Sequence, residues 1–304
     1  MNQIATEQNS QKQLERLAAQ RELYSSAKKW HGFQIILTVI IPVILATLAF
    51  LLNNFAIIAA IFGVASFLID ISLIEPIVKK RKTKAAKIQE MFDCDVLQLP
   101  KSPLKTVDDI AVEEVLLYYN AHIKIATNVE KIKDWYSPKV SQLPLKIARI
   151  LCQRTNCWWD SKLRERYSSF LKFTSIIVFS TMMIVGYISN LSLIEITLIA
   201  GGLVPFFQFC IKQCNDNLDA ANRLNELVIY SRQIWDDALE NKYSDDILKT
   251  NSRRLQDEIF EHRSKSPLIL DLYYNVFRDS DEALMNRSSE ILVDEAINRP
   301  QNSR

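Results

Sequence analysis

The chain has 304 residues, of which 48% are hydrophobic and 24% charged, and its net charge is +2. These averages are those of an ordinary soluble protein, but the distribution of the charges excludes that class. Nearly all charges lie outside four apolar segments, 33–52, 55–74, 173–188 and 191–211. Inside them only Asp70 and Glu195 are charged. We therefore expect a membrane protein with a charged aqueous part.

The placement of the glycines excludes several kinds of site. All five lie at or inside the apolar segments: Gly32, Gly63, Gly186, Gly201 and Gly202. Phosphate-binding loops and dinucleotide-binding turns need glycines where the backbone approaches phosphate, and a nucleophile elbow needs them beside its serine. The aqueous part can build none of these. His31, His122 and His262 are scattered, without metal or triad spacing. We expect no enzyme, no cofactor and no metal site.

The four apolar segments are predicted to form two transmembrane hairpins. A helix rises about 1.5 Å per residue, so roughly 20 apolar residues cross a hydrocarbon core of about 30 Å. Only Asn53-Asn54 separates the first two segments, and only Ser189-Asn190 separates the last two. Each pair must therefore return to the side of the membrane from which it started.

Lysines and arginines predict the orientation of both hairpins. They lie before the first and third apolar segments and after the second and fourth, whereas neither short loop carries a charge. The positive-inside rule then places both termini and the central region in the cytoplasm. We expect no cleavable signal peptide, because 32 mostly polar residues precede the first apolar segment. The cysteines would mostly face a reducing compartment, so disulfides are not expected.

The apolar segments divide the chain into five regions. These are an N-terminal cytoplasmic helix, the first hairpin, a central cytoplasmic region, the second hairpin and a C-terminal cytoplasmic region, at 1–32, 33–74, 75–172, 173–211 and 212–304. No proline or glycine lies from Phe206 to Ser266, so the fourth span is predicted to continue as a long helix. Ser266-Pro267 is predicted to open another helix. The predicted fold is an all-α membrane protein with four spans and an all-helical cytoplasmic region.

One aqueous segment combines arginines with tryptophans. Such a combination can hold a nucleotide without a glycine loop, because arginine pairs with phosphate and aromatic rings stack on bases. The candidate ligand-binding residues are Arg154, Trp158, Trp159, Arg164 and Arg166. Tryptophans also favour membrane interfaces, and this alternative stays open.

A basic run follows the first hairpin. It contains Lys79, Lys80, Arg81, Lys82, Lys84 and Lys87. We expect these side chains to face anionic lipid and to set the topology.

Polar and small residues inside the spans are candidates for a pore or an ion site. Acidic groups in a span usually face protein or water, so Asp70 and Glu195 predict either such a site or interfacial side chains. Gly201, Gly202 and Pro205 allow close helix contact or a bend.

Four segments resemble those of a known family. Tyr24–Lys28, Ile88–Asp93, Asp134–Tyr136 and Ile150–Asp160 are similar to segments of the bacterial S-4TM family, the SMODS-associated four-transmembrane effectors. The most specific part is Cys-Gln-Arg-x-Asn-x-x-Trp-Asp within the last segment. The resemblance covers most of the chain, including the two hairpins.

The resemblance implies a membrane effector of bacterial antiphage defence. A neighbouring nucleotidyltransferase would make a cyclic nucleotide second messenger, as in CBASS-like signalling, and the effector would form a pore or disrupt the inner membrane, causing cell death or dormancy. We also expect a homo-oligomer in the lipid bilayer and no nucleic-acid partner. The main alternative is a membrane scaffold or sensor that recruits a partner through its cytoplasmic helices. A small transporter is less consistent with spans that lack a charged midplane site.

Overall fold

The computed structural model describes residues 2–52, 55–103, 110–124, 130 and 132–299. Across these residues the chain is helical and contains no β-strand. The elements in chain order are α1 (Ile4–Glu7), α2 (Gln11–Ile35), the π-helical η1 (Ile36–Ile40), α3 (Ile41–Leu51), α4 (Phe55–Ile69), the π-helical η2 (Asp70–Ile74), α5 (Glu75–Val96), α6 (Val112–His122), the 3-10 helix η3 (Pro138–Gln142), α8 (Leu145–Ile188), α9 (Leu193–Leu239), α10 (Asp245–Lys265) and α11 (Asp271–Asn298).

Four helical runs are long and apolar enough to cross a membrane, and each covers all or nearly all of one predicted span. Helix α8 has 44 residues and α9 has 47. At about 1.5 Å per residue they extend roughly 66 and 71 Å, more than twice the hydrocarbon thickness. Each helix therefore continues well beyond its apolar segment. The predicted all-α membrane fold and the long continuation of the fourth span are confirmed.

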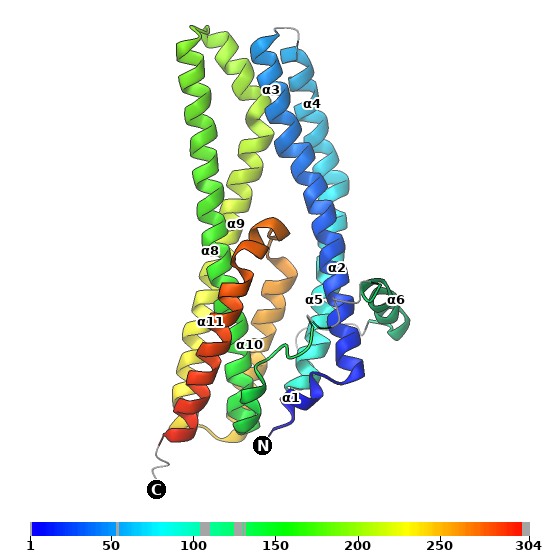
Figure 1. Cartoon of the computed structure of the whole chain (residues 1–304), viewed down its shortest axis with the longest axis vertical. Coiled ribbons are helices and arrows are strands. Elements are labelled where there is room, and N and C mark those ends of the chain that lie inside the picture. The colour runs from blue at the N-terminus through cyan, green and yellow to red at the C-terminus, as the bar shows by residue number, and fades with distance from the viewer. Residues whose placement is uncertain (1, 53–54, 104–109, 125–129, 131, 300–304) are drawn as a thin grey trace.

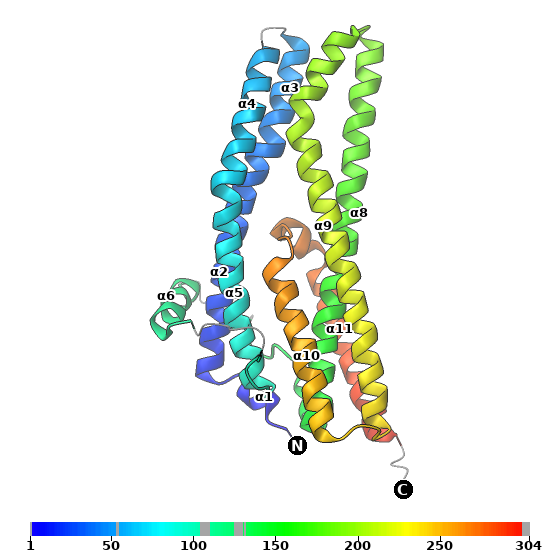
Figure 2. The same cartoon turned by 180° about the vertical axis from the view of Figure 1, so that it is seen from behind.

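The helices form two antiparallel hairpins that lie side by side (Figure 1). The first consists of α2–η1–α3 and α4–η2–α5, and the second of α8 and α9. At the apolar end α9 contacts α3 and α4, and at the other end α10 contacts α5, α8 and α9. Figure 2 shows α10 and α11 beside the charged halves of the long helices. We call this end, made of α1, α10, α11 and the charged halves of α2, α5, α8 and α9, the polar body. Both chain ends lie there.

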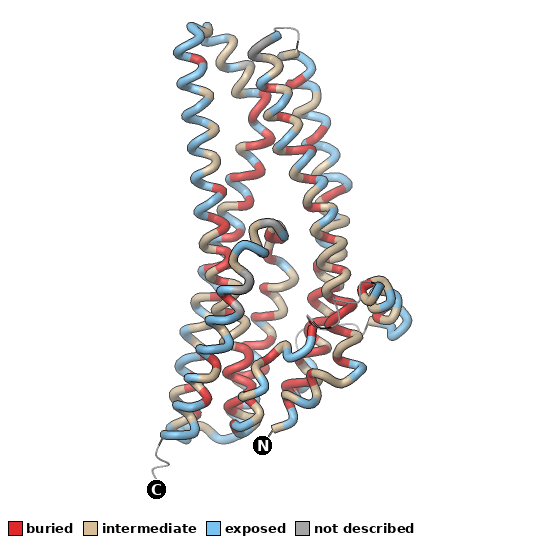
Figure 3. The backbone as a smooth tube through the Cα atoms, in the orientation of Figure 1, coloured by how far each residue is buried: buried red, intermediate tan, exposed pale blue. Residues whose placement is uncertain are grey.

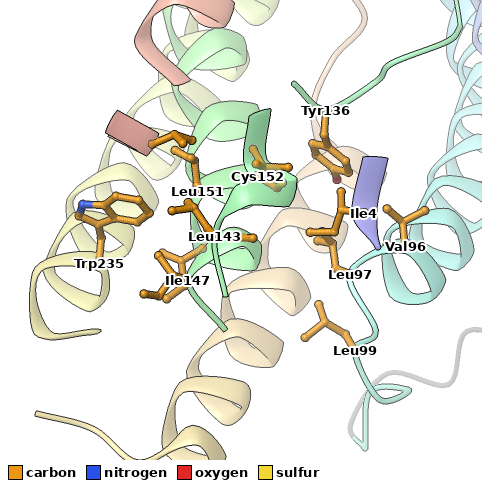
Figure 4. Close-up of a cluster of buried hydrophobic side chains, with 14 of the residues drawn as sticks. Ile4, Val96, Leu97, Leu99, Tyr136, Leu143, Ile147, Leu151, Cys152 and Trp235 are labelled. Atoms are coloured by element: carbon orange, nitrogen blue, oxygen red, sulfur yellow. The ribbon is translucent and has the colours of Figure 1, made fainter. Parts of the chain in front are cut away.

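Burial differs between the two ends (Figure 3). The apolar segments expose large side chains, with Ile57 71% and Leu193 80% exposed. The polar body instead has a hydrophobic core in which Trp235 of α9, Leu151 of α8 and Ile4 of α1 are at most 1% exposed (Figure 4). Apolar surface is stable only away from water, so the exposed segments suit a lipid environment and the polar body folds around its own core.

The prediction of a helix opening at Ser266-Pro267 is wrong. Residues 267–270 are not helical, and α11 begins at Asp271. The carbonyl oxygens of Ser266 and Pro267 accept hydrogen bonds from the side chains of Lys82 and Arg164, respectively. These side chains take the place of the amides that a helical turn would supply.

Candidate functional site

A network of buried polar side chains joins α5, α8 and α10 inside the polar body. At its centre Asp93 is fully buried. The Tyr136 hydroxyl donates to Asp93 Oδ1 at 2.6 Å, and Gln256 Nε2 donates to Oδ2 at 2.9 Å. Arg263 forms an ion pair with the same carboxylate. Burial, and then the neighbouring carboxylate, raise the pKa of Tyr136 well above its usual value, so its hydroxyl remains a donor.

The second carboxylate of the network is Glu90. Arg253 Nη2 lies 2.6 Å from Glu90 Oε1, and Gln256 Nε2 donates to Oε2 at 2.8 Å. Gln153 Nε2 donates to Gln256 Oε1 at 3.0 Å, and Ser252 Oγ donates to Gln153 Oε1 at 2.7 Å. In a low-dielectric interior, charges and amides that satisfy one another hold their helices in one arrangement.

The network is built from the segments that carry the family resemblance. Glu90 and Asp93 lie in one such segment on α5, Tyr136 lies in another, and Gln153 lies in the most specific one on α8. Because α5 continues the first hairpin and α8 begins the second, the network ties the two hairpins together at the polar end.

Sequence reasoning missed the α10 side of the network. Arg253, Gln256 and Arg263 are three and seven positions apart, so they share one face of the helix. This helical spacing of the three polar residues is the signal that the sequence itself contains. Their partners on α5 could not be read from it.

A small cavity lies beside the network. Its volume is about 10 Å³, and its lining residues include Tyr136, Thr155, Asn156 and Ser289. A space of this size holds no more than a water-sized group. In this conformation the cavity is too small for a nucleotide.

A second polar cluster surrounds the connection between α10 and α11. His262 Nε2 lies 2.7 Å from Asp160 Oδ2, and Arg164 Nε lies 3.0 Å from Oδ1. Burial acts to raise the pKa of Asp160, but Arg164 and His262 hold it well below its usual range. Arg164 Nη1 also donates to Asn217 Oδ1 at 2.9 Å and to the Pro267 carbonyl at 3.0 Å.

Asp160, His262 and Ser266 do not have the geometry of a catalytic triad. Ser266 Oγ lies 3.0 Å from His262 Nδ1 and 3.2 Å from Nε2, so it sits over the ring and not along the lone pair of either nitrogen. The serine is 3% exposed and cannot meet a substrate in this conformation. Among the described residues no group of three or more His, Cys, Asp or Glu side chains is arranged to hold a metal ion.

His262 gives the protein an expected pH dependence. Burial lowers its pKa, although Asp160 acts in the opposite direction. A lowered pKa means that the unfolded chain binds a proton first, so stability declines as the pH falls below about 6.5. We expect His262→Gln to flatten the melting temperature of the purified protein between pH 7.5 and 5.5.

The dependence of melting temperature on pH should be weaker in His262→Gln but should not disappear, because burial also lowers the pKa of His122. Identical slopes for the wild type and His262→Gln would contradict this assignment.

The five predicted ligand-binding residues lie on three faces of α8. Arg164 points inward and is engaged by Asp160, Asn217 and the Pro267 carbonyl. Arg166 pairs with Asp281 of α11 at 2.9 Å. The structure therefore does not bring the five together into one open site.

The remaining three residues have different surroundings. The Trp159 ring packs edge-on against Tyr274 at 5.5 Å between centroids. Arg154 and Trp158 are four residues apart and share a half-buried face of α8. Arg232 lies among the charged neighbours of Arg154. A ligand-binding role for Arg154 and Trp158 stays a prediction.

The basic run after the first hairpin is divided among several partners. Lys79 and Lys80 are exposed, as lipid-facing side chains must be. Arg81 donates to Ser26 Oγ at 2.7 Å, Lys84 pairs with Glu114 of α6, and Lys87 is half-buried. Interaction of Lys79 and Lys80 with lipid stays a prediction.

The lipid-facing assignment of Lys82 is wrong in this conformation. Its side chain is buried, and Nζ donates to the carbonyl oxygens of Lys265 at 3.0 Å and Ser266 at 2.7 Å. These carbonyls end α10, and a cation at a helix C-terminus is favourable. Burial, and then the nearby Arg164, lower the pKa of Lys82 to about 8.

Asp70 faces protein, while Glu195 begins a helix. Gln34 Nε2 donates to Asp70 Oδ1 at 2.6 Å, and His31 Nδ1 is 2.8 Å from Gln34 Oε1. Gln34 was missed because the spans were defined by charge alone. Glu195 forms a capping box with Ser192, accepting its backbone N–H at 2.8 Å. A role of either acid in ion passage stays a prediction.

The two adjacent glycines of α9 have different surroundings. A Cβ atom on Gly202 would lie 3.6 Å from Ala59 Cβ and 3.7 Å from Ala46 Cβ, whereas one on Gly201 would meet no atom within 4 Å. A Cβ on Gly63 would lie 3.6 Å from Pro205 Cγ. The close contact between the hairpins is therefore made by Gly202 and Pro205 and not by Gly201.

Comparison with known proteins identifies the family. Residues 2–292 match the family described as "SMODS-associating 4TM effector domain". A curated protein of Bacillus cereus (strain VD146), described as "Probable CBASS effector molecule", is 25% identical over 290 residues, which cover 91% of this chain and 94% of that protein. No solved structure matches the chain. With a family match along nearly its whole length and four helices apolar enough to span a membrane, the chain belongs to the SMODS-associating 4TM effector family and is a membrane effector.

Proposed function

We propose that this chain is a CBASS membrane effector that receives a cyclic nucleotide second messenger from a neighbouring nucleotidyltransferase and then permeabilises the inner membrane of the bacterium, causing cell death or dormancy. The observation that carries the proposal is the buried network between α5, α8 and α10. Two of these helices, α5 and α8, continue without a break toward the spans. A rearrangement of the network is thereby transmitted to both hairpins. The description of the Bacillus cereus relative supports the same signalling context.

The proposed orientation places the polar body and both termini in the cytoplasm, where the messenger is made. Permeabilisation would need several copies or local disruption of the lipid bilayer. Hydroxyls in the described spans, such as those of Thr47, Thr174, Ser175 and Thr197, donate to backbone carbonyls of their own helices. One copy therefore offers little polar surface to line a channel, so we propose a homo-oligomer that acts without an enzymatic step.

Dye release tests the proposal. Liposomes containing the purified protein should retain dye alone and release it when the matching cyclic nucleotide is added. In cells, growth should stop when the effector is produced with its active neighbouring synthase, and should continue with a synthase that lacks catalytic activity.

Folded protein that neither leaks with any product of that synthase nor arrests growth with it would contradict direct permeabilisation. Recruitment of a partner by the polar body without leakage would favour the scaffold alternative instead.

A further inference from the structure

The connection between α10 and α11 lies between the two hairpins, where the polar body meets the apolar segments (Figures 1 and 2). Ser266, Leu268 and Ile269 of this connection are between 3% and 8% exposed. A surface loop would expose such residues. This connection is instead part of the packing between the hairpins.

Cations from three different helices hold the connection. Lys82 of α5 donates to the Lys265 and Ser266 carbonyls, and Arg164 of α8 donates to the Pro267 carbonyl. Lys28 of α2 forms an ion pair of 2.5 Å with Asp271, the first residue of α11. The connection is therefore fastened to both hairpins at once.

The cluster contains a positive charge that is not compensated by contact. Among the described residues Lys82 makes no ion pair, and its two acceptors are neutral carbonyls. Its strongest charged influences are the like charges of Arg164 and Lys79, with Asp216 and Glu75 acting more weakly. A buried cation without a counter-ion is unfavourable, and an anion at this position would remove that cost.

Aromatic rings lie beside these cations. Lys28 Nζ is 5.0 Å from the centroid of the Tyr274 ring, which packs against Trp159 at 5.5 Å. Cations that pair with phosphate, next to rings that stack on bases, are the groups that bind a nucleotide.

We propose that Lys28, Lys82 and Arg164 form a binding site for a phosphate-bearing anion, and that the α10–α11 connection of the chain itself occupies this site in the present structure. The inference rests on the proposed function, in which the anion is the phosphodiester of the nucleotide messenger. Phosphate offers full negative charges to Lys82 and Arg164, to which the connection offers only carbonyl dipoles. Binding of the anion and docking of the connection exclude each other. The anion therefore removes the contacts by which the α10–α11 connection joins the two hairpins.

Hydrogen–deuterium exchange of the full chain tests the competition. In phosphatidylcholine nanodiscs, millimolar pyrophosphate should raise exchange of the amides of residues 265–274 by about two- to fivefold, which is the range for loss of one weak charge contact. Sodium chloride at equal ionic strength should not. Lys82→Met should show fast exchange without pyrophosphate and no further response. Lys82→Arg should restore the response, and Lys80→Met, an exposed lysine of the same helix, should behave as the wild type.

A second arm identifies the source of the phosphate. If phosphatidylglycerol nanodiscs raise exchange in the wild type without pyrophosphate, and Lys82→Met abolishes this effect, then a lipid headgroup fills the site. If only pyrophosphate raises exchange in the wild type, and phosphatidylglycerol does not, then the site takes a soluble ligand.

The absence of any response in the wild type, or an equal response in Lys82→Met, would overturn the site. Should Lys82→Met fail to fold, Asp271→Asn decides, because removing the internal carboxylate should lower the half-maximal pyrophosphate concentration by about two- to fivefold. An unchanged midpoint would also overturn it. Exchange is measured without any leakage, so failure of the pore function and failure of this site remain distinguishable.

Discussion

Replacing Asp93 with alanine should destabilise the polar body by about 3–5 kcal/mol, because it leaves a buried cation without its partner. Asp93 accepts hydrogen bonds from Tyr136 and Gln256 and pairs with Arg263, all inside the network. Because Asp93 is fully buried, water cannot replace these two hydrogen bonds and the ion pair when the carboxylate is removed. Denaturant unfolding of the detergent-solubilised protein, followed by tryptophan fluorescence, measures the change.

Asp95→Ala is the matched control for this prediction. Asp95 lies two residues away on the same helix, but its side chain is 38% exposed and pairs with Lys12 and Arg16. Its loss should cost less, about 1–2 kcal/mol, because the Arg16 guanidinium, although only 10% exposed, still donates to the Met91 carbonyl at 2.9 Å. Equal effects of the two substitutions would show that the buried network does not govern stability. A loss of leakage control in folded Asp93→Asn would link the network to the proposed function.

Replacing Gly202 with leucine should separate α9 from the first hairpin and cost about 1–3 kcal/mol, the usual range for overpacking. The Cβ alone would already be in van der Waals contact with Ala59 and Ala46, so the remaining atoms of leucine have no room. The measurement is the melting temperature of the protein in nanodiscs, together with spontaneous dye leakage from liposomes.

Gly201→Leu is the control for the second prediction. It adds the same atoms one position away, where no atom lies within 4 Å of a new Cβ. We expect a change within about 0.5 kcal/mol. If the two leucine variants melt and leak alike, the contact at Gly202 does not hold the hairpins together.

Both substitutions act on contacts that join the two hairpins. Gly202 joins them within the apolar segments, and Asp93 belongs to the network that joins them in the polar body. The α10–α11 connection lies between these two zones. Under the proposed function the spans rearrange when the messenger binds, so substitutions at such contacts should shift the equilibrium between the two arrangements.

Sequence reasoning predicted part of the candidate site. Segment Ile150–Asp160 contains the most specific part of the family resemblance, and its Gln153 and Asp160 each belong to one of the two polar clusters. Their role was not predictable, because the arginines and tryptophans of that region suggested an open ligand site. Arg164 turns inward because Asp160 lies one helical turn before it and Asn217 faces it from α9.

The sequence by itself determined the four spans, the two hairpins and the all-helical class, because hydropathy, charge placement and the 3.6-residue period act over a few neighbouring residues. The tertiary structure alone decided that Lys82 is buried and not at the lipid surface, that residues 267–270 leave the helix, and that Asp93 meets Arg263. Lys82 and Ser266 are 184 residues apart, and Asp93 and Arg263 are 170 apart. Such pairs form only when whole helices pack, so no local pattern in the sequence specifies which partner each buried charge will have.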